Sequence, residues 1–442
     1  MKNDHVLIIG AGLCGTLLAI RMAQRGYRIT LCEKRPDMRT TDLVAGRSIN
    51  LALSNRGLKA LRLVGLEDAV RDECIPMYGR MIHALAGEPF LSKYSGRPDE
   101  YINSVSRSGL NIALLNIAET YDTIDLKFGM NCTGIDLKNA TAHFQQSTDI
   151  QADVVIGTDG AGSAVRRSMM SHTTELLFNY SQDFLRHGYK ELTIPPTANG
   201  DYRIEKNALH IWPRGNFMVI ALPNLDGSFT VTMFHPYGGD YGFDALDTRE
   251  KVKQFFEEQF PDLPPHSPTL LDDYFTNPVG TLGTIRCYPW QAFGKALIMG
   301  DAAHAIVPFY GQGMNASFED VTVFDQILDK HEGDWKRIFT TFQDTRQPDA
   351  NAIADLAVDN FHEMRDHTAN PIFIEKRQLE MQLEQTFPDY YSKYSLVTFN
   401  ENMSYSEAMK RGRRQDEILM NLCEQHEGDS WDLEAVRTKV LT

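Results

Sequence analysis

The sequence is poor in cysteine and carries no excess of positive charge, and each deficit excludes a class of function. Only six of its 442 residues are cysteines, and no two form a C-x-x-C pair, so we expect neither a metal site nor a redox dithiol. Isolated cysteines are typical of a reducing compartment, which favours a cytoplasmic protein. Acidic residues outnumber basic ones by 59 to 44, and the net charge of −15 disfavours nucleic acid as a partner.

Long hydrophobic runs are absent as well. The best candidate, residues 296–309, is interrupted by Asp301 and His304, so we expect no transmembrane anchor. The N-terminus leads directly into residues 6–9, Val-Leu-Ile-Ile, which we interpret as a core strand and not as part of a signal peptide. The length and a hydrophobic share of 42% are typical of a soluble protein with two or three domains. We expect a monomer or a weak homodimer.

Residues 10–15, Gly-Ala-Gly-Leu-Cys-Gly, are the clearest positive signal. They lie between a predicted strand and a predicted helix, the context in which G-x-G-x-x-G indicates dinucleotide binding. Gly10 permits the tight turn, Gly12 lets the backbone approach a pyrophosphate, and Gly15 lets helix and strand pack closely. Glu33 ends the next predicted strand, where a carboxylate binds ribose hydroxyls and repels a 2′-phosphate, so FAD or NAD is expected and NADP is not. The alternative is a plain glycine turn with a solvated Glu33.

A second glycine motif, residues 157–166, follows another predicted strand. Asp159 and Gly160 stand at the end of that strand, and Ser163 can cap the helix that follows. Taken alone, this motif is equally consistent with an ordinary strand-to-helix turn, so it gains weight only from its neighbours in the sequence.

The third motif starts at the end of a buried apolar strand, where Asp301 can bind ribityl hydroxyls. Gly311 and Gly313 precede a predicted helix that starts near Asn315. The N-terminus of that helix can face the negative charge of a reduced flavin. A bare turn is the alternative for the two glycines, and we interpret His304 as a packed or surface histidine.

In this order and spacing, the three motifs resemble the single-component FAD aromatic hydroxylase family typified by p-hydroxybenzoate hydroxylase, over residues 5–345. The resemblance implies the α/β class, with a Rossmann-type FAD-binding domain, an antiparallel β-sheet substrate domain and a helical C-terminal region. No second strand–GxGxxG–helix unit is present, so NADPH is expected as a co-substrate that meets the flavin transiently. FAD is expected to be non-covalent, and its expected contacts are Gly10, Gly12, Leu13, Cys14, Gly15, Glu33, Lys34, Arg35, Ala52, Arg107, Cys132, Asp159, Asp301, Gly311, Gly313, Met314 and Asn315.

The pattern of short and long periodic segments divides the chain. Between about residues 191 and 286, short segments bounded by Pro, Gly and Asn predict an antiparallel sheet. Beyond about residue 346 the pattern is mostly helical. We therefore expect an FAD-binding domain from 1–72, 101–168 and 286–345, a substrate domain from 73–100 and 169–285, and a helical region, 346–442, that closes the substrate pocket.

Further segments narrow the resemblance to the kynurenine 3-monooxygenase family, along nearly the whole chain. Members of that family from eukaryotes carry a C-terminal membrane anchor, whereas this sequence ends in a polar segment, 431–442, so the likeness is to the soluble bacterial form. The segments that carry this resemblance are residues 46–54, 78–83, 187–192, 209–213, 220–224, 360–364 and 394–399.

The resemblance implies that L-kynurenine contacts Arg80, Tyr94, Asn360 and Tyr394. Arg80 can hold the carboxylate in a bidentate fork, the two tyrosines can donate hydrogen bonds, and Asn360 can pair with the amino-acid end. The alternative is a surface charge for Arg80 and ordinary core packing for the others. The ring needs an apolar box, for which the candidates are Leu209, Leu222, Phe234, Pro308, Phe309 and Met364.

The implied reaction converts L-kynurenine to 3-hydroxy-L-kynurenine with NADPH and O2, through a flavin C4a-hydroperoxide, in tryptophan degradation and pyridine-nucleotide biosynthesis. The protein would position the ring and exclude water, and no side chain would be a catalytic acid or base. The alternatives are another aromatic substrate, a flavin-dependent halogenase or reductase, and a binding protein without turnover. A halogenase needs a tunnel lysine that we cannot locate. The basic residues 410–414 can touch an anionic membrane, although a solvated helix face is the simpler interpretation.

Overall fold

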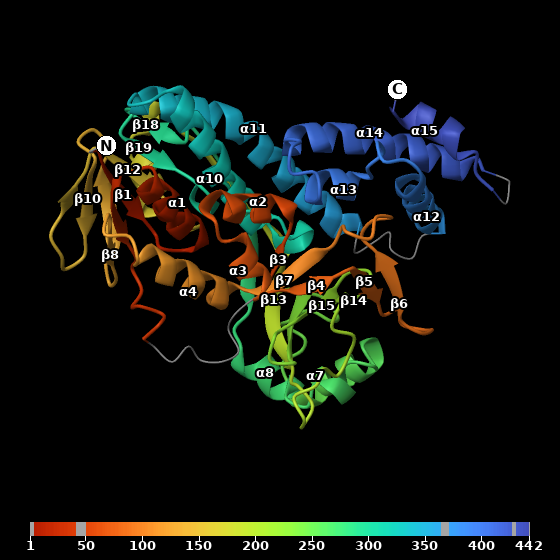
Figure 1. Cartoon of the computed structure of the whole chain (residues 1–442). Coiled ribbons are helices and arrows are strands. Elements are labelled where there is room, and N and C mark those ends of the chain that lie inside the picture. The colour runs from red at the N-terminus through yellow and green to blue at the C-terminus, as the bar shows by residue number, and fades with distance from the viewer. Residues whose placement is uncertain (1–3, 41–49, 364–370, 427–429, 442) are drawn as a thin grey trace.

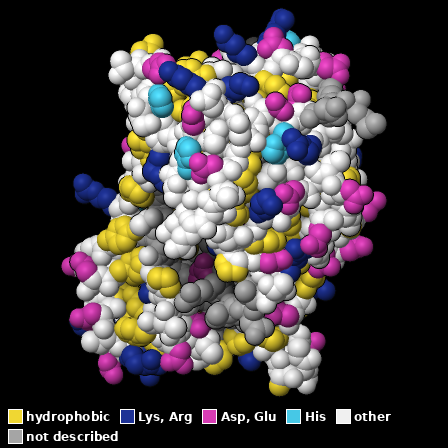
Figure 2. Space-filling model, turned by 90° about the vertical axis from the view of Figure 1, so that its left-hand side faces the viewer, with side chains coloured by type: hydrophobic (Ala, Val, Ile, Leu, Met, Phe, Trp, Pro, Cys, Tyr) yellow, Lys and Arg dark blue, Asp and Glu magenta, His cyan; other side chains and the backbone are white. Residues whose placement is uncertain are grey.

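The computed structural model describes residues 4–40, 50–363, 371–426 and 430–441 (Figure 1). Two large sheets lie at the centre of the molecule, with helices packed around them. The C-terminal helices gather at one end, beside the second sheet. On the face that Figure 2 shows, Lys and Arg side chains are interspersed with Asp and Glu, so no field of one sign covers it.

The first sheet holds the glycine motifs. Its strand order is β18-β19-β12-β1-β2-β8, and its neighbours pair in parallel except β18 with β19. All five residues of β1 are buried, as expected for a parallel strand covered by helices on both faces. The predicted strands and the predicted helix after the first glycine turn are confirmed. The bounds are β1 His5–Ile9, β2 Arg28–Cys32, β8 Ile124–Lys127, β12 Val154–Gly157, β18 Gln291–Ala292, β19 Ala296–Ile298, α1 Leu13–Gln24, α4 Arg107–Ala118, α5 Ala164–Met170, α6 Thr173–Leu176, α9 Asp301–His304 and α10 Gly313–Lys330.

Two small antiparallel sheets flank this core. One has the order β11-β10-β9, and the other has the order β3-β7-β4 and leads from the first large sheet towards the second. The bounds are β3 Asn50–Leu53, β4 Ile75–Met77, β7 Ile102–Ser106, β9 Cys132–Asp136, β10 Thr141–Phe144, β11 Ile150–Gln151, α2 Asn55–Val64 and α3 Glu67–Arg71.

The second large sheet has the order β17-β13-β16-β15-β14-β5-β6. The antiparallel pairing that the sequence predicted holds for every neighbour except β14 with β5, which pair in parallel. Trp212 and Met233 pack on the face covered by α7 and α8, whereas Ile211 and Phe234 pack on the opposite face, because side chains alternate along a strand. The bounds are β5 Gly79–Ile82, β6 Phe90–Lys93, β13 Asn179–Ile194, β14 Leu209–Pro213, β15 Met218–Pro223, β16 Phe229–Pro236, β17 Gly280–Tyr288, α7 Arg249–Gln259, η1 Pro264–His266 and α8 Leu270–Thr276.

A single long helix, α11, joins the two halves of the molecule (Figure 1). It runs without a break across the boundary predicted at residues 345–346. Its first half buries Phe339 and Phe342 in the core of the first sheet, and its second half buries Ile353 and Leu356 in the core beside the second sheet. The remaining bounds are η2 Pro308–Tyr310, α11 Trp335–His362, α12 Pro371–Thr386, α13 Lys393–Thr398, α14 Tyr405–Glu424 and α15 Leu433–Leu441. The predicted fold class, including the helical C-terminal region, is confirmed.

Two features are absent from the part of the chain that the structure describes. None of the described helices combines the length and the apolar character needed to cross a bilayer. Within the same part of the chain, no three His, Cys, Asp or Glu side chains are arranged to hold a metal ion.

Candidate functional site

A cavity of about 740 Å³ extends from the first glycine turn to the face of the second sheet that α7 and α8 leave open. Residues from distant parts of the sequence line it, including the ends of β1, β2 and β12 and the segments around α9, η2 and α13. Most of the predicted contacts are among its lining residues: Gly10, Gly12, Leu13, Cys14, Glu33, Lys34, Arg35, Ala52, Arg80, Tyr94, Arg107, Cys132, Asp159, Leu209, Leu222, Phe234, Asp301, Pro308, Phe309, Gly311, Gly313, Met314 and Tyr394.

The three glycines of the first motif meet three different surroundings. Gly10 has a φ of +105°, and a Cβ there would lie 2.7 Å from the carbonyl oxygen of Thr158. A Cβ on Gly15 would lie 2.0 Å from the carbonyl oxygen of Gly10, so this glycine serves close packing and does not line the cavity. A Cβ on Gly12 would have no neighbour within 4 Å, because Gly12 opens onto the cavity.

Glu33 lies directly behind this turn and is 7% exposed. Its Oε2 accepts a hydrogen bond from the backbone N–H of Ala11 at 3.1 Å, and its Oε1 accepts two from Arg35, at 3.1 Å from the backbone and 2.8 Å from Nε. These contacts fix the carboxylate at the end of β2, beside the cavity, which is the position that ribose recognition requires.

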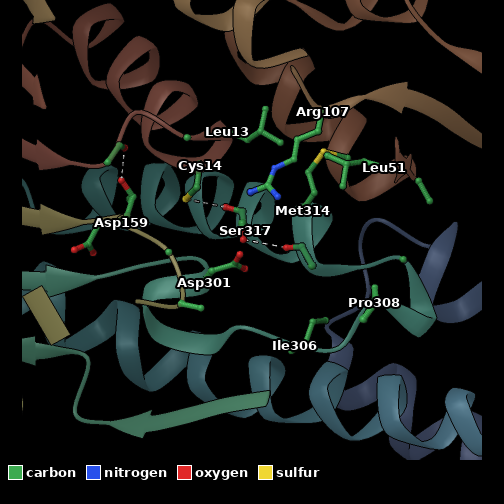
Figure 3. Close-up of a pocket in the computed structure, with 18 of the residues that line it drawn as sticks. Leu13, Cys14, Leu51, Arg107, Asp159, Asp301, Ile306, Pro308, Met314 and Ser317 are labelled. Atoms are coloured by element: carbon green, nitrogen blue, oxygen red, sulfur yellow. Dashed lines mark hydrogen bonds between the residues drawn. The ribbon is translucent and has the colours of Figure 1, made fainter. Parts of the chain in front are cut away.

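Two further carboxylates face the middle of the cavity (Figure 3). Asp159 accepts a hydrogen bond at Oδ2 from the backbone N–H of Ala164 at 2.6 Å, whereas its buried Oδ1 has no partner among the described residues. Burial raises the pKa of Asp301 above its ordinary value, because the opposing charge of Arg107 offsets only part of this effect. Figure 3 shows Arg107 and Asp301 pointing into the same space from different elements, α4 and the start of α9.

This half of the cavity fits FAD. The helix α1 begins at the glycine turn without a side-chain cap and without an acidic residue in its first turn, so its free N–H groups can donate hydrogen bonds to a pyrophosphate. Gly12 leaves room for that group, and Glu33 lies beside the space for a ribose. The Oδ1 of Asp159, unpaired among the described residues, can accept a hydrogen bond from the cofactor. Asp301 and the N-terminus of α10 lie further along the cavity, where the flavin end would reach.

We expect Gly12→Ala to weaken FAD binding without unfolding the protein. Gly12 has φ −76° and ψ −175°, which alanine adopts freely, and the protein leaves space for the methyl group. A methyl group forced against the pyrophosphate should cost about 1–3 kcal/mol of FAD affinity. Fluorescence titration of the apoprotein with FAD measures this loss.

Gly15→Ala is the matched comparison, because its methyl group would collide with the backbone of the turn itself. Gly15→Ala should therefore lower the thermal midpoint of the FAD-free protein, and Gly12→Ala should not. Equal FAD affinity in Gly12→Ala and the wild type would show that the pyrophosphate does not lie against this turn.

The opposite end of the cavity carries a cation beside two stacked tyrosine rings. The rings of Tyr94 and Tyr394 stack with their centres 5.2 Å apart and an interplanar angle of 10°. The Arg80 guanidinium carbon lies 5.6 Å from the centre of the Tyr94 ring and 5.1 Å from that of the Tyr394 ring. Within the described residues, Arg80 forms no ion pair, and the Tyr94 hydroxyl and Arg80 Nε are buried without a hydrogen-bond partner. The cluster is therefore equipped to receive an anionic group.

An apolar box lies between this cluster and the flavin half of the cavity. Five of the six residues predicted for it line the cavity, and the sixth, Met364, lies outside the described residues. The lining residues that the sequence interpretation missed include Met218, Ile220, Ile306 and Tyr310. Two of them follow from the alternation along β15, because Met218 and Ile220 share a face with Leu222.

Two residues predicted to contact a ligand, Asn315 and Asn360, do not line the cavity. They lie behind its wall and form hydrogen bonds to the backbone of the wall. Asn315 accepts a hydrogen bond at Oδ1 from the backbone N–H of Ser54 and donates from Nδ2 to the carbonyls of Ala52 and Gly311, at 2.8 and 2.9 Å. Asn360 donates from Nδ2 to the carbonyl of Phe309 at 2.6 Å. A direct contact of either residue with a ligand stays a prediction.

A buried ionic network supports the turn that carries Asp301. Asp320 on α10 is fully buried and accepts hydrogen bonds from the backbone N–H of Gly300 at 2.9 Å and from Arg346 Nε at 2.8 Å. His304 Nε2 lies 2.7 Å from the same carboxylate, so His304 is a packed residue, as the sequence indicated. Burial by itself raises the pKa of Asp320, but the charges of His304 and Arg346 outweigh it and lower that pKa to about 2.

The fold and this cavity define a flavoprotein. The pattern of the FAD binding domain family matches residues 3–357, which confirms the expectation of FAD. The chain is 45% identical to the kynurenine 3-monooxygenase of Myxococcus xanthus (strain DK1622), over 96% of this chain and 91% of that protein. It is 44% identical to the kynurenine 3-monooxygenase of Dictyostelium discoideum, over 99% and 96% of the two chains. The chain belongs to the kynurenine 3-monooxygenase family, as the sequence indicated.

Solved structures with much lower identity share the fold. The tetrameric form of 2-methyl-3-hydroxypyridine-5-carboxylic acid oxygenase superposes with a TM-score of 0.67 at 20% identity, covering 89% of this chain and 99% of that one. PqsL of P. aeruginosa, solved in complex with 2-aminobenzoylacetate, gives 0.67 at 17% identity, covering 83% and 97%.

Proposed function

We propose that this flavoprotein hydroxylates L-kynurenine to 3-hydroxy-L-kynurenine, with NADPH as the reductant and O2 as the source of the oxygen atom. The observation that carries the proposal is a continuous cavity with FAD-binding features at one end and Arg80 beside two stacked tyrosines at the other, with the Arg80 Nε unpaired among the described residues. Kynurenine has a carboxylate at one end and an electron-rich aniline ring at the other, and the apolar box between the two halves suits that ring.

The chemistry that bound FAD would supply here is the transfer of two electrons from NADPH to O2, with one oxygen atom entering the ring and the other leaving as water. The side chains bind and orient the substrate. Arg80 holds the carboxylate in a two-pronged contact, and the hydroxyls of Tyr94 and Tyr394 donate to the amino-acid end. The aliphatic and aromatic walls, among them Phe234 and Phe309, hold the ring and keep water away from it, so that oxygen reaches the carbon beside the amino group. Asn360 supports this wall through the Phe309 carbonyl.

We further propose the cofactor contacts named from the sequence, with Gly15 and Asn315 acting through the shape of the turns. The protein would work in the cytoplasm, since its six cysteines are free and most are buried. It would work as a monomer or a weak homodimer. A halogenase would need a lysine near the substrate. Among the described lining residues, the one lysine is Lys34, which lies beside Glu33 at the end of the cavity opposite Arg80.

We expect L-kynurenine to accelerate flavin reduction by NADPH. Substrate seated on Arg80 excludes water from the cavity and orders its walls, so reduction should be slow without kynurenine and fast with it. Anaerobic stopped-flow absorbance of the flavin, with and without kynurenine, measures both rates.

Two fragments provide the controls. Aniline has the ring without the amino-acid end, and alanine has the amino-acid end without the ring, so neither should match kynurenine. Reduction at the same rate with and without kynurenine, or faster reduction with an unrelated aromatic acid, would contradict the proposed substrate.

A further inference from the structure

The two stacked tyrosines come from segments that are 300 residues apart, and the same helix holds both. Tyr94 follows β6 at the edge of the second sheet, and Tyr394 lies in the first turn of α13. The helix α12 packs against the backbone of both segments, and it lines no part of the cavity that the structure describes. Glu384 on α12 is 2% exposed.

The carboxylate of Glu384 bridges the two segments. Its Oε2 accepts a hydrogen bond from the backbone N–H of Gly96 at 2.9 Å, and its Oε1 accepts one from the backbone N–H of Ser392 at 2.8 Å. Gly96 lies two residues after Tyr94, and Ser392 lies two residues before Tyr394. A movement of this one side chain would therefore displace both tyrosines.

Two further contacts hold α12 against the Tyr94 segment. Arg377, also on α12, donates from Nη2 to the carbonyls of Lys93 and Tyr94, at 2.9 and 2.5 Å. A Cβ on Gly96 would lie 2.6 Å from the carbonyl oxygen of Met381, so only glycine allows this approach. The helix therefore contacts the backbone on both sides of Tyr94.

The ionised form of Glu384 suits a side chain that must accept hydrogen bonds from two segments. Burial by itself raises the pKa of Glu384, but a hydrogen bond from Ser395 and the charge of Arg377 outweigh it and bring that pKa below its usual value. The side chain is therefore a carboxylate, with an acceptor oxygen for each of the two backbone N–H groups.

We propose that Glu384 is a positioning residue for substrate recognition: it fixes the spacing of Tyr94 and Tyr394 around Arg80 without touching the substrate. The inference rests on the proposed function, because it assigns the two tyrosines to the amino-acid end of kynurenine. It extends that function to α12, a helix outside the cavity wall.

Glu384→Gln tests the inference with minimal change of volume. Glutamine offers one acceptor oxygen, so one of the two N–H groups would face an amide NH2 group and its segment would shift. A misplacement of about 1 Å costs up to about 10²-fold in catalysis, so we expect kcat/KM for kynurenine to fall by roughly tenfold to 10²-fold, mainly through KM. The share of NADPH consumption that yields hydrogen peroxide should rise, while FAD affinity should not change.

Two further variants make the result decisive. Glu384→Asp keeps the charge but cannot span both segments, so its KM should lie between those of the wild type and Glu384→Gln. Glu417→Gln, an exposed carboxylate on α14, should behave as wild type. A folded, FAD-bound Glu384→Gln protein with wild-type KM and coupling would overturn this inference alone, and equal loss of FAD binding would reduce Glu384 to a structural role. A wild-type protein that does not respond to kynurenine would overturn the proposed function as well.

Discussion

Arg80→Ala is expected to bind FAD normally and to lose most of its affinity for L-kynurenine. The loss should be about 2–5 kcal/mol, the usual cost of removing one partner of a buried, hydrogen-bonded charge pair. Arg80 is suited to be that partner because, within the described residues, it forms no ion pair and its Nε is buried and unpaired. The shift of flavin absorbance on titration with kynurenine measures the affinity.

The conservative variants separate charge from geometry. Arg80→Lys should recover only part of the loss, since an ammonium group cannot form the two-pronged contact. Tyr94→Phe and Tyr394→Phe each remove one neutral donor and should cost about 0.5–1.5 kcal/mol. Kynurenine affinity equal to wild type in Arg80→Ala would place the carboxylate anchor elsewhere in the cavity.

Asp320→Asn is expected to lower the free energy of unfolding by about 1.5–3 kcal/mol, because it removes a buried, charge-assisted hydrogen bond, while Arg346 keeps its ion pairs with Glu319 and Asp349. The amide offers one acceptor oxygen where the carboxylate offers two, so either the fully buried Arg346 or the Gly300–His304 turn faces an NH2 group and loses its acceptor on α10. Urea unfolding followed by fluorescence measures the change. Asp272→Asn, in the exposed pair of Arg249 with Asp272, is the matched control and should change stability little.

The same carboxylate predicts a dependence on pH. The pKa of Asp320 in the folded protein is about 2, below its ordinary value of 3.8. A lowered pKa means that the folded state binds the proton less readily than the unfolded state, so the stabilisation is complete above the ordinary value and is lost as the pH falls towards 2. The wild type should therefore lose more stability than Asp320→Asn between these two values. Parallel losses in the two proteins would contradict the role of Asp320.

Local sequence patterns were sufficient for the flavin half of the molecule. The turn of residues 10–15, the strand ends at Glu33 and Asp159, and the turn at Asp301 each combine a glycine or acidic residue with an adjacent apolar strand. The carboxyl ends of parallel strands meet at one edge of a sheet, so these local signals converge there without further information. The class of protein was determined by the sequence for this reason.

The substrate half was named through the family resemblance, and only the tertiary structure decided how its residues meet. Arg80, Tyr94 and Tyr394 belong to three segments with no shared local pattern, and each alone is consistent with a surface charge or a core aromatic residue. Their meeting depends on the pairing of β5 with β14 and on the packing of α12 between β6 and α13. On α11, the Nδ2 of Asn360 donates to the backbone carbonyl of Phe309. The packing of α12 makes a glutamate outside the cavity the link between the two tyrosines. Contacts between residues so far apart in the chain follow from the packing of the whole fold, because no local pattern in the sequence records them.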